Sequence, residues 1–151
     1  MGKIVFYAPT GAAVAMFPKT SALFESKGVH RRLFLKALAL AGVIASGIVV
    51  VYALFAEFIT AFFFGSKYPL AASGLFMYGL AMGLFAMSYL VMAYFLSVGT
   101  TKVSYSLLGV LVVQMTLIAV FHSSIPQVVN IMVACSVLSL ISMLPFYLKL
   151  R

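Results

Sequence analysis

Long hydrophobic runs, separated by short polar or charged segments, dominate the pattern along this chain. Residues 37–56 carry no charge and are rich in Ala, Val, Ile and Leu. A bilayer core about 30 Å thick needs about 20 apolar residues in a helix, so this run predicts a membrane-spanning helix. Residues 71–97 lie in a second uncharged stretch, which ends at Gly99 and the polar residues up to Lys102. Glycine and polar residues end helices, so we predict a second span here.

The uncharged stretch after Lys102 is too long for one span. It covers residues 103–148, about 69 Å as one helix at about 1.5 Å per residue, more than twice the bilayer core. Residues 122–126 (HSSIP) interrupt it with competing hydrogen-bonding groups and a proline that lacks an N–H donor. The pattern predicts a turn there, spans at 106–121 and 128–148, and a kink at Pro145 in the last span.

The amino-terminal segment is less regular. It reaches spanning length only if it absorbs Lys19 and runs over residues 4–24, as we predict. Residues 57–69 combine a glutamate, a lysine and several aromatic residues, a mixture typical of the membrane–water boundary, and we predict an interfacial turn there. The sequence therefore predicts a single transmembrane domain over residues 1–151, all-α and integral to the membrane, with about five transmembrane helices.

The composition agrees with this interpretation. Of 151 residues, 65% are hydrophobic and 8% are charged, with a mean hydropathy of +1.20. Soluble domains are about 45–50% apolar and about 25% charged.

The placement of the charge predicts an orientation. A net charge of +8 would suggest nucleic acid in a soluble protein. Here eight of the ten Lys and Arg residues lie near the first and third predicted connections or in the tail, and Lys3 and Lys67 lie on the other side. By the positive-inside rule we expect a cell-membrane protein with its amino terminus outside and its carboxyl terminus in the cytoplasm. We expect no nucleic-acid partner.

Few residues offer catalytic chemistry. The two carboxylates, Glu25 and Glu57, are predicted on opposite membrane faces, as are His30 and His122. Neither pair can then act as acid and base or share a metal ion. Cys135 is the only cysteine and lies in an apolar run. We expect no enzymatic activity, no catalytic residues, no metal site and no cofactor.

Polar groups inside the predicted spans are the candidates for function, because such groups are costly in hydrocarbon. Lys19 could contact an anionic substrate or reach the interface with its long side chain. Gln114 could contact substrate or, like Asn130, hydrogen-bond between helices. We take Lys19 and Gln114 as candidate substrate-binding residues. Gly79 and Gly83 form a GxxxG pattern, which favours close helix packing in lipid.

Four local patterns, taken in order, resemble a known family. They are Gly2-Lys3-Ile4-Val5 leading to Pro9, then Phe17-Pro18-Lys19-Thr20-Ser21, then the basic stretch through Arg31-Arg32 to Lys36-Ala37-Leu38, then Phe64-Gly65-Ser66-Lys67-Tyr68 followed by Ala71-Ala72. Over about residues 2–102 they are similar to the carboxyl-terminal half of the polysaccharide biosynthesis protein, or oligosaccharide flippase, family. This family shares a superfamily with MATE exporters and lipid II flippases. Beyond Lys102 only the hydropathy agrees.

The resemblance implies part of the carboxyl-terminal lobe of a MATE-like flippase. Family members place two lobes around a central cavity and move lipid-linked sugar units across the membrane by alternating access. The expected partners are the lipid bilayer, a lipid-linked glycan, and either the missing amino-terminal lobe or a second copy of the chain. Two alternatives stay open. One is a cation-coupled small-molecule exporter of the same superfamily, for which Glu57 is the available carboxylate, and the other is a non-transporting membrane assembly subunit.

Overall fold

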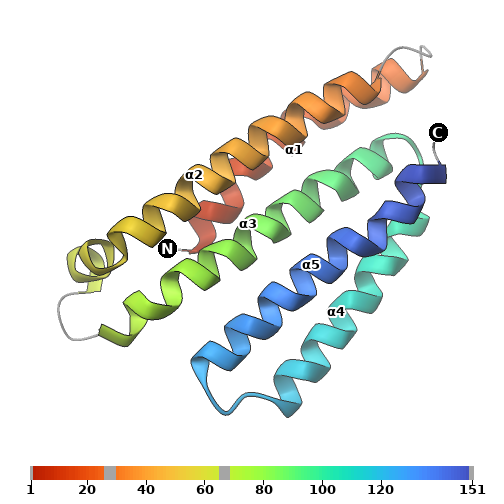
Figure 1. Cartoon of the computed structure of the whole chain (residues 1–151). Helices are drawn as coiled ribbons and strands as arrows, with labels where there is room; N and C mark the ends of the chain where they lie inside the picture. Colours follow the sequence, from red (N-terminus) through yellow and green to blue (C-terminus); the bar gives the residue numbers. More distant parts are fainter. Residues whose placement is uncertain (1, 26–29, 65–68, 150–151) are drawn as a thin grey trace.

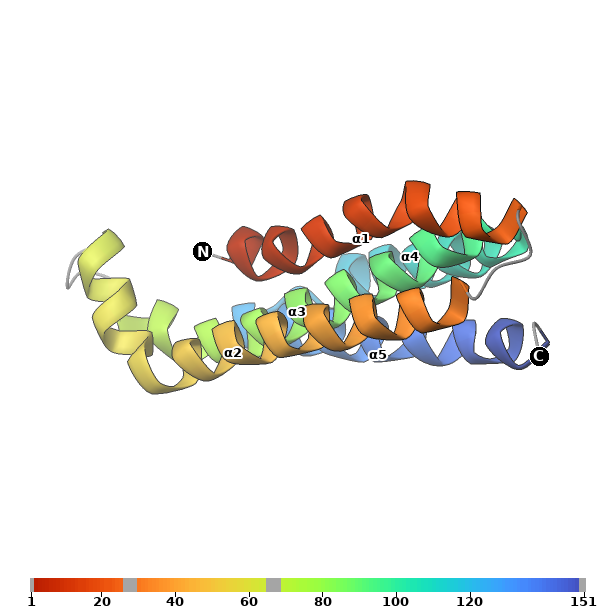
Figure 2. The same ribbon diagram turned by 90° about the horizontal axis from the view of Figure 1, so that it is seen from above.

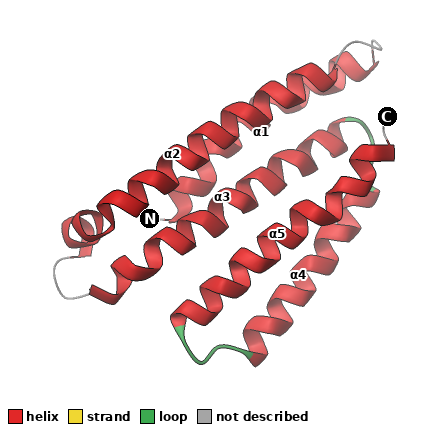
Figure 3. Cartoon of the chain, viewed as in Figure 1, coloured by secondary structure: helices red, strands yellow, loops and turns green. Residues whose placement is uncertain are grey.

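The computed structural model describes residues 2–25, 30–64 and 69–149, and these form five α-helices joined by short connections (Figures 1 and 3). The helices are α1 (Gly2–Glu25), α2 (His30–Phe64), α3 (Pro69–Ser97), α4 (Lys102–Val120) and α5 (Ile125–Lys149). Consecutive helices run in opposite directions (Figure 1). The all-α prediction is therefore confirmed for the described residues.

Helix α3 is the centre of the bundle. It packs against α1, α2 and α5, whereas α4 packs mainly against α5. Seen from above, α1 and α4 lie to one side of α3, and α2 and α5 lie to the other side (Figure 2). A groove lies on each side of α3, and α3 residues line both grooves.

Among the described residues, four helices are long and apolar enough to cross a membrane, over Arg31–Phe62, Gly74–Ser97, Lys102–Val120 and Ile125–Tyr147. Large hydrophobic side chains such as Val43, Leu54, Tyr105 and Leu108 are exposed on their outer faces. Hydrocarbon is the medium in which such surfaces are stable. These are the features of a multi-pass membrane protein.

Helix α1 is not among these four. It lies alongside α2 and α3 and has 24 residues, which gives a length of about 36 Å. Pro9 and Pro18 lie inside it, and Lys19 follows the second proline, so its sequence is less apolar than that of the other helices. That α1 crosses the membrane stays a prediction.

Close helix contacts rest on small residues. The GxxxG residues Gly79 and Gly83 on α3 face α2, where Tyr52 contacts Gly79 and Ala45 lies against Gly83. Val5 of α1 also approaches Gly83. The predicted close packing is therefore confirmed, but its partners are helices of the same chain, so this face is not free for another subunit.

The predicted turns on either side of α4 are present. Before it, Gly99 adopts a positive φ of 76°, its N–H donates to the Leu96 carbonyl at 3.1 Å, and the Thr100 N–H donates to the Phe95 carbonyl at 2.8 Å. This is the Schellman arrangement, which ends a helix where glycine can adopt the left-handed conformation. After it, α4 ends at Val120 and α5 begins at Ile125, so the break predicted at residues 122–126 is confirmed.

Residues 57–64 of the interfacial turn predicted over 57–69 are helical, so a non-helical turn is wrong there, and the interfacial position stays a prediction. Helix α2 continues to Phe64, after a kink at Phe55, where φ is −120° and ψ is 23°. The segment between Phe55 and Phe64 contains no proline or glycine, so nothing in it prevents helix formation. Residues 65–68 lie outside the described residues. In α5 the helix continues through Pro145 to Lys149. A bend of this continuous helix at Pro145 stays a prediction.

Candidate functional site

A groove of about 470 Å³ lies between α1 and α4, with α3 and α5 beneath it. We call it the α1–α4 groove. Its lining residues come from four helices: Phe6 on α1, Met82, Phe85, Ser88, Tyr89 and Met92 on α3, Leu107, Val110, Leu111 and Gln114 on α4, and Met132 and Ser139 on α5. The α4 residues are spaced i, i+3, i+4, i+7, which places them on one helix face.

The groove is open on one side. Helices α1 and α4 form its two walls, and in the part of the chain that the structure describes their backbones do not approach each other closely. At the α1 wall the ring of Phe6 packs against the ring of Tyr89 on α3, with 6.1 Å between the ring centres. Tyr89 remains 38% exposed, so part of its side chain is accessible from the open side.

Two serines join α3 to α5 at the floor of the groove. The Oγ atoms of Ser88 and Ser139 lie 2.6 Å apart, and both residues are buried. Ser88 Oγ also lies 3.0 Å from the Leu84 carbonyl, and Ser139 Oγ lies 2.7 Å from the Ser136 carbonyl. The two hydroxyls carry two protons for these three contacts, so at most two of the contacts are full hydrogen bonds at one time. Each oxygen has two lone pairs, so each keeps at least one that can accept a hydrogen bond.

Gln114 supplies an amide on the α4 wall. Its side chain is half-buried and faces the groove. Hydrogen bonds between described helices join Ser21 to Ser97, Arg31 to Tyr147 and Ser88 to Ser139, and Gln114 takes part in none of these. A role of Gln114 in binding a molecule in the groove stays a prediction.

Lys19 lies elsewhere. Its side chain is exposed on α1 and does not line the groove. It follows the groove residue Phe6 by 13 positions, which corresponds to about 20 Å along the helix and about 220° around it. The structure therefore does not bring Lys19 and Gln114 together.

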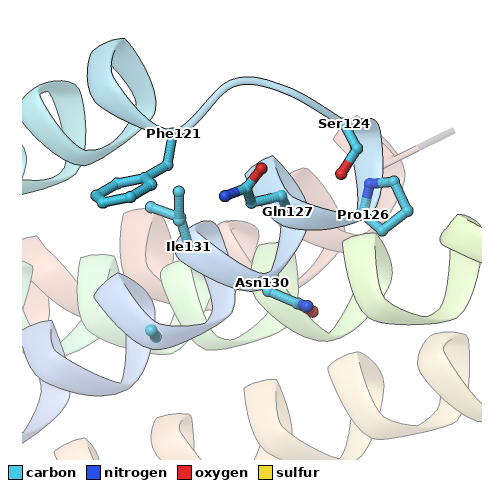
Figure 4. A pocket seen from close by; sticks show the side chains of 7 residues that line it. Phe121, Ser124, Pro126, Gln127, Asn130 and Ile131 are labelled. Atoms are coloured by element: carbon cyan, nitrogen blue, oxygen red, sulfur yellow. The ribbon is translucent and has the colours of Figure 1, made fainter.

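Asn130 lines a different and shallower cavity of about 540 Å³ beside the α4–α5 connection (Figure 4). Gln127 lies beneath the connecting loop, in the same cavity as Phe121 and Ser124 (Figure 4). Asn130 is exposed, one helical turn further along α5. This polar end of the bundle is separate from the α1–α4 groove.

Sequence reasoning identified Gln114 but missed the other polar residues of the groove, Ser88, Tyr89 and Ser139. A signal for one of them was present, since Ser136, Ser139 and Ser142 recur every three residues along α5. Which helix faces this serine row could not be inferred from the sequence. Among the described residues, no group of three or more His, Cys, Asp or Glu side chains could hold a metal ion.

Comparison of the chain with family models, with curated proteins and with solved structures found no match.

Proposed function

We propose that this chain forms one wall of a transport path for a lipid-linked oligosaccharide, as part of a flippase in the cell membrane. The observation that carries the proposal is the open α1–α4 groove with polar groups inside a membrane-spanning bundle. The groove is open on one side, and the unit that faces this open side across the transport path would be an amino-terminal lobe or another copy of the chain.

The depth of the polar groups supports a transport role. Gln114 follows Lys102, the first residue of α4, by 12 positions, which corresponds to about 18 Å along the helix. In a core about 30 Å thick this is close to the midplane. Polar side chains at this depth are costly, so they hydrogen-bond a neighbouring helix or face a substrate path, and Gln114 makes none of the described bonds between helices. Substrate sites of transporters also lie near the midplane, between two moving units.

The chemistry of the groove suits a sugar headgroup. The Gln114 amide offers both donors and acceptors, and the Tyr89 hydroxyl can do the same. Sugar hydroxyls need such partners once they leave water, since an unpaired polar group in an apolar medium costs several kcal/mol (about 2–7). Apolar residues complete the lining, so a lipid chain can remain alongside in the bilayer. No covalent step is required.

A cation-coupled exporter is less well supported. Such a protein needs a carboxylate within the transport path, and Glu57 is exposed on α2 beyond the kink at Phe55. It does not line the groove. A non-transporting assembly subunit is the other alternative, and the exposed apolar face of α4, with Leu108, Val112 and Met115, would suit it.

Photo-crosslinking tests the proposal. A polyprenyl-pyrophosphate sugar with a photoreactive group on the sugar should label groove peptides of α3 and α4, and unlabelled substrate should compete. Gln114→Leu should lower this labelling about 2–10-fold, the effect of losing one neutral hydrogen bond. Gln127→Leu is the matched control, since Gln127 is also half-buried but lines the other cavity. Labelling that is unsaturable, or equal in both variants, would favour the assembly subunit.

A further inference from the structure

A second groove lies on the opposite side of α3, between α2 and α5. It has a volume of about 420 Å³, within the range of about 300–1,000 Å³ that ligand sites occupy. Helices α2 and α5 each pack against α3, but their backbones do not approach each other closely in the described ranges. We call this space the α2–α5 groove.

The walls of this groove are apolar along two helical turns. On α2 they comprise Phe34, Leu35 and Leu38, and on α5 they include Leu140 and Leu144. Met87 and Val91 of α3 contribute to the floor. On α5 the lining runs from Leu140 to Tyr147, and these seven positions correspond to about 10 Å along the helix. Such a surface suits a hydrocarbon chain and offers little to a sugar or a free ion.

Arg31 lies beside one end of the groove, in contact with the lining residue Tyr147. It precedes Phe34, Leu35 and Leu38 by three, four and seven positions, so it continues the same face of α2. Its Nε donates a hydrogen bond of 2.8 Å to the hydroxyl of Tyr147, the groove residue of α5 nearest the carboxyl terminus. The guanidinium carbon also lies 5.4 Å from the centre of the Tyr147 ring. Arg31 is therefore held across the end of the groove by two contacts with one residue.

The charge at this end has no described counterpart. Arg31, Arg32 and Lys36 are exposed. Among the side chains that the structure describes, the one carboxylate is that of Glu57, which lies 26 residues further along α2, or about 39 Å at about 1.5 Å per residue. Arg31 uses Nε for the bond to Tyr147, and its Nη groups make no hydrogen bond to the described residues, so they can donate to a ligand. Such a fork of donors binds carboxylates and phosphates in bidentate fashion, and in a lipid headgroup the phosphate supplies this partner.

We propose that the α2–α5 groove binds an anionic phospholipid, with one acyl chain along the apolar walls and the phosphate on Arg31. Basic residues beside a cleft between membrane helices recognise anionic lipid headgroups in this way. Helix α2 begins at His30, so Arg31 sits at the end of a membrane-length segment, where a headgroup lies. The bound lipid links α2 to α5 and does not depend on the transport proposed for the α1–α4 groove.

Native mass spectrometry of the full chain in detergent tests this proposal with phosphatidylglycerol and with phosphatidylcholine of the same acyl chains. Phosphatidylglycerol should bind preferentially, and Arg31→Gln should weaken its binding about tenfold, the effect of losing a charge-assisted hydrogen bond. Lys102→Gln is the matched control, because it removes the same charge on α4, away from the groove. Equal weakening by both substitutions would overturn the proposal.

A second pair of variants tests the place of the acyl chain. Leu144 and Leu108 are exposed to a similar extent, 56% and 60%, but only Leu144 lines the α2–α5 groove. Leu144→Trp should therefore reduce lipid binding, whereas Leu108→Trp should not. Inorganic phosphate should fail to displace the lipid. Displacement by phosphate would show that the site binds anions without recognising the acyl chain, and it would overturn the proposal. A lipid-independent dimer that Leu144→Trp dissociates would assign the groove to a second copy and overturn the proposal.

Discussion

The ring of Tyr52 on α2 lies against Gly79 on α3 so closely that a Cβ atom at position 79 would stand 2.9 Å from Tyr52 Cδ2. Tyr52 is buried with Val5, Val49 and Leu75, so its ring has little room to move. Gly79→Ala should force α2 and α3 apart and lower the free energy of unfolding by about 1–3 kcal/mol. Thermal unfolding of the purified chain in detergent measures the change.

Gly83→Ala is the control for that experiment. A Cβ atom at position 83 would lie 3.5 Å from the Ala45 Cβ, an ordinary contact. Alanine is also favoured over glycine in a helix by about 1 kcal/mol, so this variant should be neutral or more stable. If both substitutions lowered stability equally, the contact with Tyr52 would not be the cause.

The hydroxyl of Thr20 makes no hydrogen bond in the described part of the chain, although the residue is fully buried. Replacing it with a methyl group removes the cost of that unpaired group, so Thr20→Val should raise the free energy of unfolding by about 1 kcal/mol. Thr10 lies on the same helix, and its Oγ1 donates a 2.9 Å hydrogen bond to the Tyr7 carbonyl. Thr10→Val should therefore give no comparable gain in the same unfolding measurement. Loss of stability in Thr20→Val would show that its hydroxyl has a partner.

The ends of α4 should lie on opposite sides of the membrane. Thr101 and Ser123 are both exposed and flank this helix. With Cys135 replaced by alanine, Ser123→Cys should react with a membrane-impermeant maleimide in intact cells, and Thr101→Cys should react only after lysis. The reason is the positive-inside rule, which places the basic end of the bundle in the cytoplasm. The reverse labelling pattern would overturn the predicted orientation.

The ends of helices were predicted well from the sequence where proline, glycine or clustered polar residues mark them. A proline, a glycine or a polar cluster changes local backbone preferences, and such signals marked both ends of α4. The end of α2 was misplaced because aromatic residues and Glu57 suggested an interface, whereas interface position and helix formation are compatible. Polarity alone does not end a helix in which each backbone N–H can still bond four residues back.

The candidate site was predicted only in part. Gln114 was predicted because an amide is rare in an apolar helix. Ser88 and Ser139 could not be predicted as a pair, because their contact depends on α3 and α5 lying side by side. Lys19 was predicted as a substrate-binding residue because it is a charged residue in a predicted span. Its position around α1 places it away from the α1–α4 groove. Helix pairing depends on contacts between residues distant in the sequence, which local patterns do not specify.

Movement of substrate across a bilayer tests the central proposal, that the α1–α4 groove is one wall of a transport path. The chain is reconstituted in liposomes with a fluorescent polyprenyl-pyrophosphate sugar. In one arm the protein density is low enough that crosslinking shows only monomers. In the other arm each chain is paired with a further copy or with a flippase amino-terminal lobe. Because alternating access needs two units that move against each other, monomers should not move the substrate. Paired chains should move it, Gln114→Leu should lower the rate of movement about 2–10-fold, and Lys19→Gln should leave the rate unchanged. Movement by monomers, or movement by paired chains that is insensitive to Gln114→Leu, would contradict the account.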